Sequence, residues 1–312
     1  MCLAALAVIV GGCQGATHEN PSSDRSLSAG SAPRTEGTSA ADERIVQSPL
    51  DAYLLRGADL YATSTAERIL STPCIKSFGF DLPSSPRNRD DMVAEQAQDD
   101  RYTYRVSDPA SARRYGYQPP PLADYSKKLG QGSFSDAFEL VYLGMRPGDG
   151  PVGVGGRPVK SPGTFGGKRI PPGGCLGAAR KELWGTASMY VHDNLAQNLG
   201  IESFQRALSD NRVLRAFGAW SACMATHGYH YADPSKPFFH HGPDGKPTAA
   251  EIQTAVADVG CKDKTDLLHR WSSVVAEYDQ KALDKNQLQL TEDRDKIQNA
   301  LKKASVILDA QP

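Results

Sequence analysis

The feature that most constrains this chain is a short pattern that occurs twice, in Leu70–Leu82 and again in Ala219–Tyr231. In both copies a cysteine is followed directly by an apolar residue, and five and six residues later by glycine and an aromatic residue. The first copy has Cys74, Ile75, Gly79 and Phe80, and the second has Cys223, Met224, Gly228 and Tyr229. The repetition predicts a duplicated helix–Cys–Gly–aromatic unit.

Each copy is typical of a helix that ends at its glycine. Before Cys223, apolar residues recur at the spacing of one helix face, at Val213, Leu214, Phe217 and Trp220. Gly228 then stands where a helix that ends in the left-handed conformation favours glycine. In the first copy, Pro73 precedes the cysteine. A proline inside a helix removes a hydrogen bond and clashes with the preceding turn, so we expect that helix to kink or end early.

The N-terminal residues form a short apolar run, Leu3–Val10, which is too short to span a bilayer and suits the core of a signal peptide. The residues that follow, Val10-Gly11-Gly12-Cys13, resemble the lipobox of bacterial lipoproteins. That resemblance implies that 1–12 is a signal peptide and that Cys13 carries the lipid. Because no Lys or Arg precedes the apolar run, we expect the translation start to lie further upstream. The alternative is a frayed apolar N-terminus of a cytosolic protein.

The segment 14–47 is rich in Ser, Ala, Gly, Thr and Pro and has almost no large apolar residues. Such a composition buries too little surface to order itself. We expect 13–47 to be a lipidated, flexible tether with a reach of roughly 30 Å. It would hold a single globular domain, 48–312, near the outer face of the cytoplasmic membrane.

Four cysteines remain once Cys2 leaves with the signal peptide and Cys13 is acylated. In an exported chain they indicate two disulfides, for which three connectivities can be drawn. We favour Cys74–Cys175 and Cys223–Cys261, because each second cysteine introduces a helix-like run. The alternative is a set of buried free thiols.

The middle of the chain predicts short elements joined by loops. We expect a helix in the later part of 49–72, a loop over 84–99 and a short strand at Tyr102, Tyr104 and Val106. One helical turn over 111–115 and a helix over 134–143 follow. The segment 144–174 is rich in Gly and Pro, which predicts a long loop with a hairpin. Seven basic residues in 144–182 suit anionic headgroups or wall polymers, although a solvated loop is the simpler interpretation.

The C-terminal third predicts longer helices. After Cys175, apolar spacing indicates one helix over 176–199. Thr248 and Glu251 form a capping-box pattern that opens a short helix ending at Val259. The segment 264–309 is the longest regular stretch, and we expect a bent C-terminal helix that packs at its start and is hairpinned or bound to a partner at its end. The whole body is therefore predicted to be mainly α and disulfide-stapled, with long Gly/Pro-rich loops.

Candidate chemistry is limited to one cluster in the sequence. The cluster comprises Cys223, His227, His230, His240 and His241. Zinc accepts such ligands, and a cysteine–histidine pair at helical spacing can make a thiolate nucleophile. However, Cys223 is more simply explained as half of a disulfide. We therefore assign no catalytic residue, no metal site and no cofactor.

The C-terminal pattern is similar to that of uncharacterised exported lipoproteins of high-GC Gram-positive bacteria. The residues that carry the similarity are Trp220, Cys223, Met224, Gly228, Tyr229, Pro234, Ala255–Val259 and Cys261. The resemblance implies an envelope location and an α-rich, disulfide-bonded body, and it implies no activity.

We therefore expect a membrane-anchored, extracytoplasmic lipoprotein that is a non-enzymatic binding or accessory protein of the cell envelope. Its expected partners are the membrane, through the lipid anchor, and a cell-wall polymer or an envelope membrane protein. The formal net charge of −1 argues against nucleic acid. The alternative is a zinc- or thiol-dependent envelope hydrolase centred on Cys223 and the nearby histidines.

Overall fold

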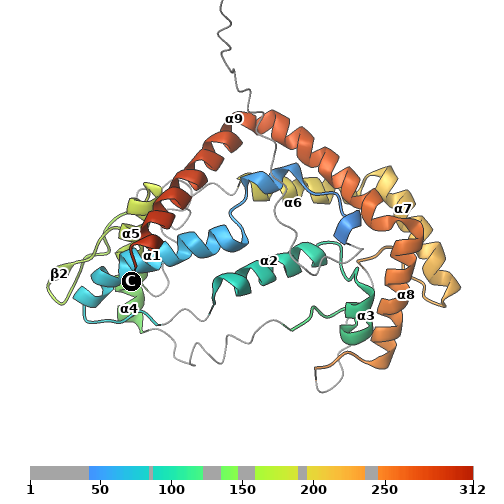
Figure 1. Ribbon diagram of the computed structural model, residues 1–312, viewed down its shortest axis with the longest axis horizontal. Coiled ribbons are helices and arrows are strands. Elements are labelled where there is room, and N and C mark those ends of the chain that lie inside the picture. The colour runs from blue at the N-terminus through green and yellow to red at the C-terminus, as the bar shows by residue number, and fades with distance from the viewer. Residues whose placement is uncertain are drawn as a thin grey trace, which may run out of the picture. The chain divides into compact units, whose positions relative to one another are not determined.

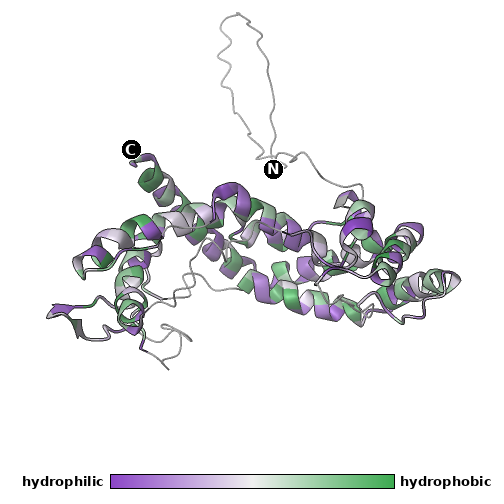
Figure 2. Ribbon diagram, turned by 90° about the horizontal axis from the view of Figure 1, so that it is seen from below, coloured by the Kyte–Doolittle hydropathy of each residue, from purple (hydrophilic) through white to green (hydrophobic). Residues whose placement is uncertain are grey.

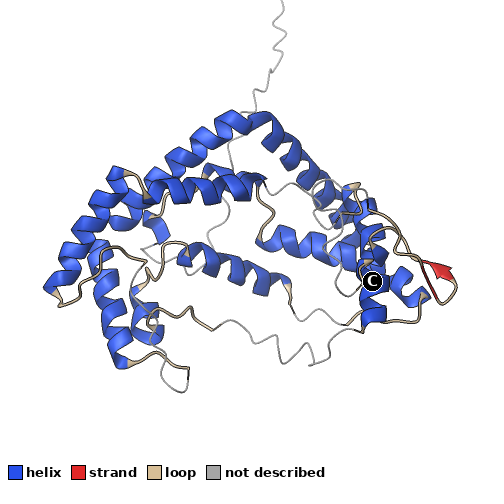
Figure 3. Cartoon of the chain, turned by 180° about the vertical axis from the view of Figure 1, so that it is seen from behind, coloured by secondary structure: helices blue, strands red, loops and turns tan. Residues whose placement is uncertain are grey.

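The computed structural model describes residues 42–83, 87–121, 135–146, 159–188, 195–235 and 245–311. These residues are mainly helical, and strands occur only in a small hairpin at one edge (Figures 1 and 3). The α-helices in them are α1 (Gly57–Ser77), α2 (Arg89–Tyr102), α3 (Pro109–Tyr115), α4 (Asp136–Leu143), α5 (Gly174–Trp184), α6 (Leu195–Leu208), α7 (Asn211–Thr226), α8 (Ala249–Thr265) and α9 (Leu267–Asp309). Two 3-10 helices, η1 (Asp42–Arg44) and η2 (Pro49–Tyr53), precede them. The predicted fold class is confirmed.

The duplicated unit is present in the backbone. In α1, the N–H of Phe80 donates to the carbonyl of Ile75 over 3.3 Å, and in α7 the N–H of Tyr229 donates to the carbonyl of Met224 over 3.1 Å. The glycines between them have left-handed φ values of 84° and 82°. Both helices therefore end in the same six-to-one hydrogen bond, which is the Schellman arrangement.

The early end expected at Pro73 is wrong, because α1 continues through it to Ser77. Proline lacks the N–H that would bond the preceding turn. The last turn is nevertheless held by the fully buried side chain of Ile75 and by the disulfide at Cys74. Tertiary contacts thus outweigh the local preference.

Each disulfide lies in an apolar cluster of its own. Cys223 and Cys261 belong to a core built mainly from α7, α8 and the first half of α9. Cys74 and Cys175 belong to a core built from α1, α4 and α5. The second half of α9 packs on α1 and α5 through Ala300 and Ala304, so α9 contacts both parts. The helices carry both hydrophobic and hydrophilic residues along their length (Figure 2).

The C-terminal helix bends at Asn286, whose φ of −120° and ψ of 17° are not helical. Its side-chain amide donates to the carbonyl of Ala282 over 2.8 Å, which is the acceptor that helical geometry assigns to the Asn286 N–H. Figure 1 shows the two halves of α9 meeting at a sharp angle. The expected bend is thus confirmed, but the end of the helix packs on this chain's own body.

Several expected elements differ from the structure. The segment expected as a loop over 84–99 contains α2, which a capping box between Asn88 and Asp91 opens. Tyr102 ends that helix, and no strand forms across 102–106. The single helix expected over 176–199 ends at Gly185, whose φ is 80°, and α6 begins separately at Leu195. These differences arise because capping groups and a left-handed glycine decide helix ends more strongly than apolar spacing.

The helix expected to stop at Val259 continues as α8 to Thr265, with Cys261 inside it rather than before the next helix. Asp266, at a left-handed φ of 53°, then separates α8 from α9. The expected helix over 134–143, the turn over 111–115 and the hairpin are confirmed as α4, α3 and the antiparallel pair β1 (Thr164–Phe165) and β2 (Lys168–Arg169).

The body begins before the expected boundary at residue 48. The N–H of Val46 donates to Ser272 Oγ over 2.9 Å, and Ile45 packs against the core around Cys223. Thr38–Pro312 groups as one compact unit. The expected signal peptide, Cys13 and the tether up to residue 41 lie outside the described residues. Within the described helices, none combines the length and the apolar character that crossing a bilayer requires.

Candidate functional site

A buried ion pair lies at the centre of the candidate site. Asp258 and Lys262 stand one turn apart on α8, and 3.1 Å separates Oδ2 of the first from Nζ of the second. Both side chains are fully buried. The indole N–H of Trp220, on α7, donates to Asp258 Oδ1 over 2.8 Å. Buried charges persist only when they are paired and hydrogen-bonded, and this pair meets that requirement.

The lysine holds the backbone of a distant segment. Its ammonium donates to the carbonyl of Tyr104 over 3.3 Å and to the carbonyl of Val106 over 2.7 Å. These two carbonyls flank Arg105, whose φ of 64° places it in the left-handed region. That region is unfavourable for a residue with a Cβ, so the surrounding contacts must impose it. Lys262 thereby fixes the backbone from which the Arg105 side chain extends.

The aspartate acts electrostatically on a second residue of the same region. Its charge affects the hydroxyl of Tyr117, whose backbone N–H donates to Glu251 Oε1 over 3.1 Å. Burial raises the pKa of the Tyr117 hydroxyl, and the charge of Asp258 raises it further. The hydroxyl therefore stays protonated near neutral pH.

Burial also acts on the pair itself. It raises the pKa of the Asp258 carboxyl, while attraction to Lys262 and hydrogen bonds from Lys262 and Trp220 lower it. Burial lowers the pKa of the Lys262 ammonium, and the charge of Asp258 opposes that change. The two charges thus depend on each other, because each one compensates the desolvation of the other.

Arg105 and Tyr117 line a pocket of about 220 Å³. Its other lining residues are Gln98, Asp99, Tyr102, Pro119 and Pro234. Tyr102 donates to the carbonyl of Gln118 over 2.9 Å, and Gln98 donates to the carbonyl of Pro120 over 2.7 Å, so the polar ends of two walls are anchored. Arg105 and Asp99 are exposed. The pocket thus combines rigid flat walls with one cation, one carboxylate and one amide.

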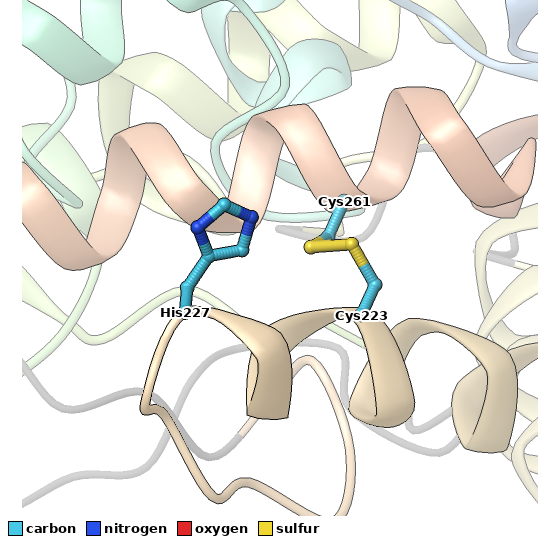
Figure 4. Close-up of side chains that lie close together, drawn as sticks. All are labelled: Cys223, His227 and Cys261. Atoms are coloured by element: carbon cyan, nitrogen blue, oxygen red, sulfur yellow. A yellow bond between two sulfur atoms is a disulfide. The ribbon is translucent and has the colours of Figure 1, made fainter.

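The sequence-predicted cysteines are brought together in pairs. Cys74 bonds to Cys175 and Cys223 to Cys261, with 5.6 Å between the Cα atoms in each pair. This is the connectivity favoured from the sequence. His227 lies beside the second disulfide (Figure 4). In this bonded state the Cys223 sulfur is neither a nucleophile nor a metal ligand. His230 is exposed, and His240 and His241 lie outside the described residues.

The basic residues expected to contact anionic partners differ in their surroundings. Arg180 is held by Glu67, with 3.3 Å between Nε and Oε2. Lys160, Lys168, Arg169 and Lys181 are exposed, and Arg157 lies outside the described residues. Only part of this segment therefore remains available as a cationic surface in the described residues.

Sequence reasoning missed the pair at Asp258 and Lys262. A signal was present, since an aspartate and a lysine at i and i+4 occur within an otherwise apolar run that includes Cys261. It missed Arg105 because a left-handed arginine has no local sequence signature.

No protein-family model matches this chain, and neither the curated proteins nor the solved structures compared with it contain a match.

Proposed function

We propose that the protein is a lipid-anchored, extracytoplasmic binding protein of the cell envelope, and that the pocket at Arg105 and Tyr117 binds an acidic saccharide unit of a wall polymer. The single observation that carries the proposal is the buried Lys262, which holds Arg105 in an unfavourable backbone conformation at the rim of that pocket. Strain of this kind clusters at ligand sites, where it positions a group in advance.

The location is supported by three features. The Val10–Cys13 segment resembles a lipobox, and the segment that follows has a tether-like composition. Two disulfides agree with an oxidising compartment. A tethered binding domain would sample the wall within its reach.

The ligand class follows from the chemistry of the pocket. Its volume of about 220 Å³ lies below that of typical sites for drug-sized ligands and suits a single sugar ring. Tyr102 and Tyr117 offer flat faces with polar tips. Arg105 forms no ion pair with any described side chain, so its planar guanidinium is available to a carboxylate. Asp99 offers acceptors for hydroxyl groups.

The binding test uses the full chain with Cys13 replaced by Ser, so that lipid does not contribute. Purified cell wall is mixed with the protein and sedimented, and soluble acidic or neutral oligosaccharides of equal length compete. We expect the wild type to sediment and the acidic oligosaccharide to release it. Arg105→Gln should weaken binding roughly 10- to 100-fold, which is the loss of a charge-assisted hydrogen bond.

Lys168→Gln on β2 is the matched control, because it removes an exposed cation that does not line the pocket. Equal losses in both variants would indicate general charge attraction and would reject the pocket. Equal release by acidic and neutral oligosaccharides would reject the acidic ligand.

The anchor is tested separately by growing the producing bacterium with an alkyne fatty acid. We expect the wild type to be labelled and Cys13→Ala to be unlabelled. Labelling of the Cys13→Ala chain would reject the proposed lipidation.

A further inference from the structure

The Cys223–Cys261 disulfide has an imidazole beside it. Cys223 lies in the last turn of α7, and His227 follows one turn later as the residue that caps this helix. Cys261 faces them from α8. Figure 4 shows the ring of His227 next to the two sulfurs. The sulfurs and a ring nitrogen all lie within 4.8 Å of one another.

The ligand spacing of a tetrahedral metal site falls within this limit. With Zn–S bonds of about 2.3 Å and Zn–N bonds of about 2.0 Å, tetrahedral ligands stand about 3.5 to 3.8 Å apart. Opening the disulfide lets the two sulfurs separate towards that spacing. The change needs rotation of two side chains, while the helices keep their places.

We propose that the protein binds one Zn²⁺ ion through Cys223, Cys261 and His227 when this disulfide is reduced. A dithiol reductant supplies two electrons and two protons, which convert the S–S bond into two thiols while the reductant becomes a disulfide. Binding of Zn²⁺ then releases both protons, and two thiolates and the neutral imidazole coordinate the ion. The exposed side of His227 leaves the fourth position to water.

The site stays assembled without the S–S bond because other contacts join the same elements. Trp220, Met224 and Leu268 are buried in the core that surrounds the cysteines. The hydrogen bond from Trp220 to Asp258 also connects α7 to α8. The metal would thus replace the disulfide as the link between two helices that already pack together.

The other disulfide is an internal comparison. Among the described residues, Cys223, His227 and Cys261 are the one group of three or more His, Cys, Asp or Glu side chains with metal-ligand spacing. Cys74 and Cys175 have no such third ligand there, so reduction of that pair alone creates no equivalent site.

The experiment uses the full chain with Cys2→Ser and Cys13→Ser, so that the four cysteines of the body remain. The chain is reduced with a phosphine in the absence of oxygen and titrated with Co²⁺, which reports tetrahedral thiolate ligation by its visible and near-ultraviolet absorption. Competition with Zn²⁺ then gives the relative affinity. Far-ultraviolet circular dichroism is recorded on every sample.

We expect one equivalent of tetrahedral Co²⁺ in the reduced chain and none in the oxidised chain. His227→Ala should bind at least about tenfold more weakly, since one of three protein ligands is lost. His230→Ala, which removes an exposed histidine three residues away, should bind as the parent does.

Three results would overturn the proposal. They are a reduced chain that binds no Co²⁺ whether or not it remains helical, a His227→Ala variant with unchanged affinity, and binding that persists in Cys223→Ser/Cys261→Ser. None of them depends on the saccharide pocket, so this proposal and the proposed function fail independently.

Discussion

Asp258 and Lys262 form an ion pair within one turn of α8, and Lys262 also holds the backbone around Arg105, a pocket residue outside that helix. Lys262 binds the carbonyls on either side of Arg105, and the charge of Asp258 acts on the hydroxyl of Tyr117. A buried ion pair is weak evidence for stability, because desolvation offsets much of the attraction. Its position here indicates that it organises the pocket.

Removing one member of this pair should be far more harmful than removing both. We expect Lys262→Met to lower the free energy of unfolding by about 3–5 kcal/mol, because Asp258 is left buried without its counter-charge. The double variant Asp258→Asn/Lys262→Met should lose less than the sum of the single changes. Urea unfolding of all variants completes a double-mutant cycle. A strictly additive cycle would show that the two charges are not coupled.

Two substitutions at Arg105 distinguish the loss of ligand binding from the relief of backbone strain. Arg105→Ala and Arg105→Gly both remove the guanidinium, so both should lose wall binding. Since φ at this position is 64°, alanine keeps the strain and glycine relieves it. We expect the glycine variant to be more stable than the alanine variant by about 1 kcal/mol. Urea unfolding of the pair measures this, and an alanine variant of equal or greater stability would contradict the strained backbone.

Because both helices end in the same glycine cap, replacing either glycine should cost a similar amount of stability. Gly79→Ala and Gly228→Ala should each destabilise the protein by about 1–2 kcal/mol, because both glycines have left-handed φ. A Cβ at either position meets no atom within 4 Å, so backbone conformation alone sets the cost.

Gly218 is the control for these changes. It lies inside α7, and a Cβ there also meets nothing within 4 Å. Gly218→Ala should therefore stabilise the protein by about 0.5–1 kcal/mol. Thermal or urea unfolding of the three variants tests the set, and a destabilising Gly218→Ala would contradict it.

Acid should weaken the start of α7. Asp210 caps this helix, with 2.8 Å between its Oδ1 and the N–H of Arg212. Hydrogen bonds from the side chain of Arg212, and then from its backbone, lower the pKa of the Asp210 carboxyl below its ordinary value of 3.8. The stabilisation is therefore fully present above the unfolded-state pKa and is lost as the pH falls through the folded-state pKa.

Asp210→Asn tests this dependence, because asparagine caps a helix as well as aspartate but carries no charge. We expect the wild type to be the more stable of the two near neutral pH. The difference should shrink as the pH falls below about 4. Urea unfolding over that range measures it, and a difference that does not change with pH would exclude the carboxylate as its source.

Local chemistry in the sequence was sufficient to predict the helical class and the helix end at Gly228, whereas at Gly79 the glycine signal competed with the early end expected at Pro73. These features depend on residues near each other in the chain, such as an apolar face and a glycine at the stop. The cysteine pairs were also predictable, because four cysteines allow only three connectivities. Where two local signals conflicted, as in 84–99 and 176–199, the capping residues and Gly185 decided the helix ends.

Only the tertiary structure decided which charged and polar side chains are buried together. Lys262 reaches Val106 across 156 residues, and Tyr117 reaches Glu251 across 134. A lysine in a helix is usually solvated, and the i, i+4 spacing of Asp258 and Lys262 in an apolar run does not by itself say that both side chains are buried. The same holds for Pro73, where packing of Ile75 and the bond at Cys74 carry α1 past a residue that locally opposes it. Residues close in sequence determine where a helix ends. The pocket, in contrast, depends on polar groups that are far apart in sequence and are buried together only in the folded chain.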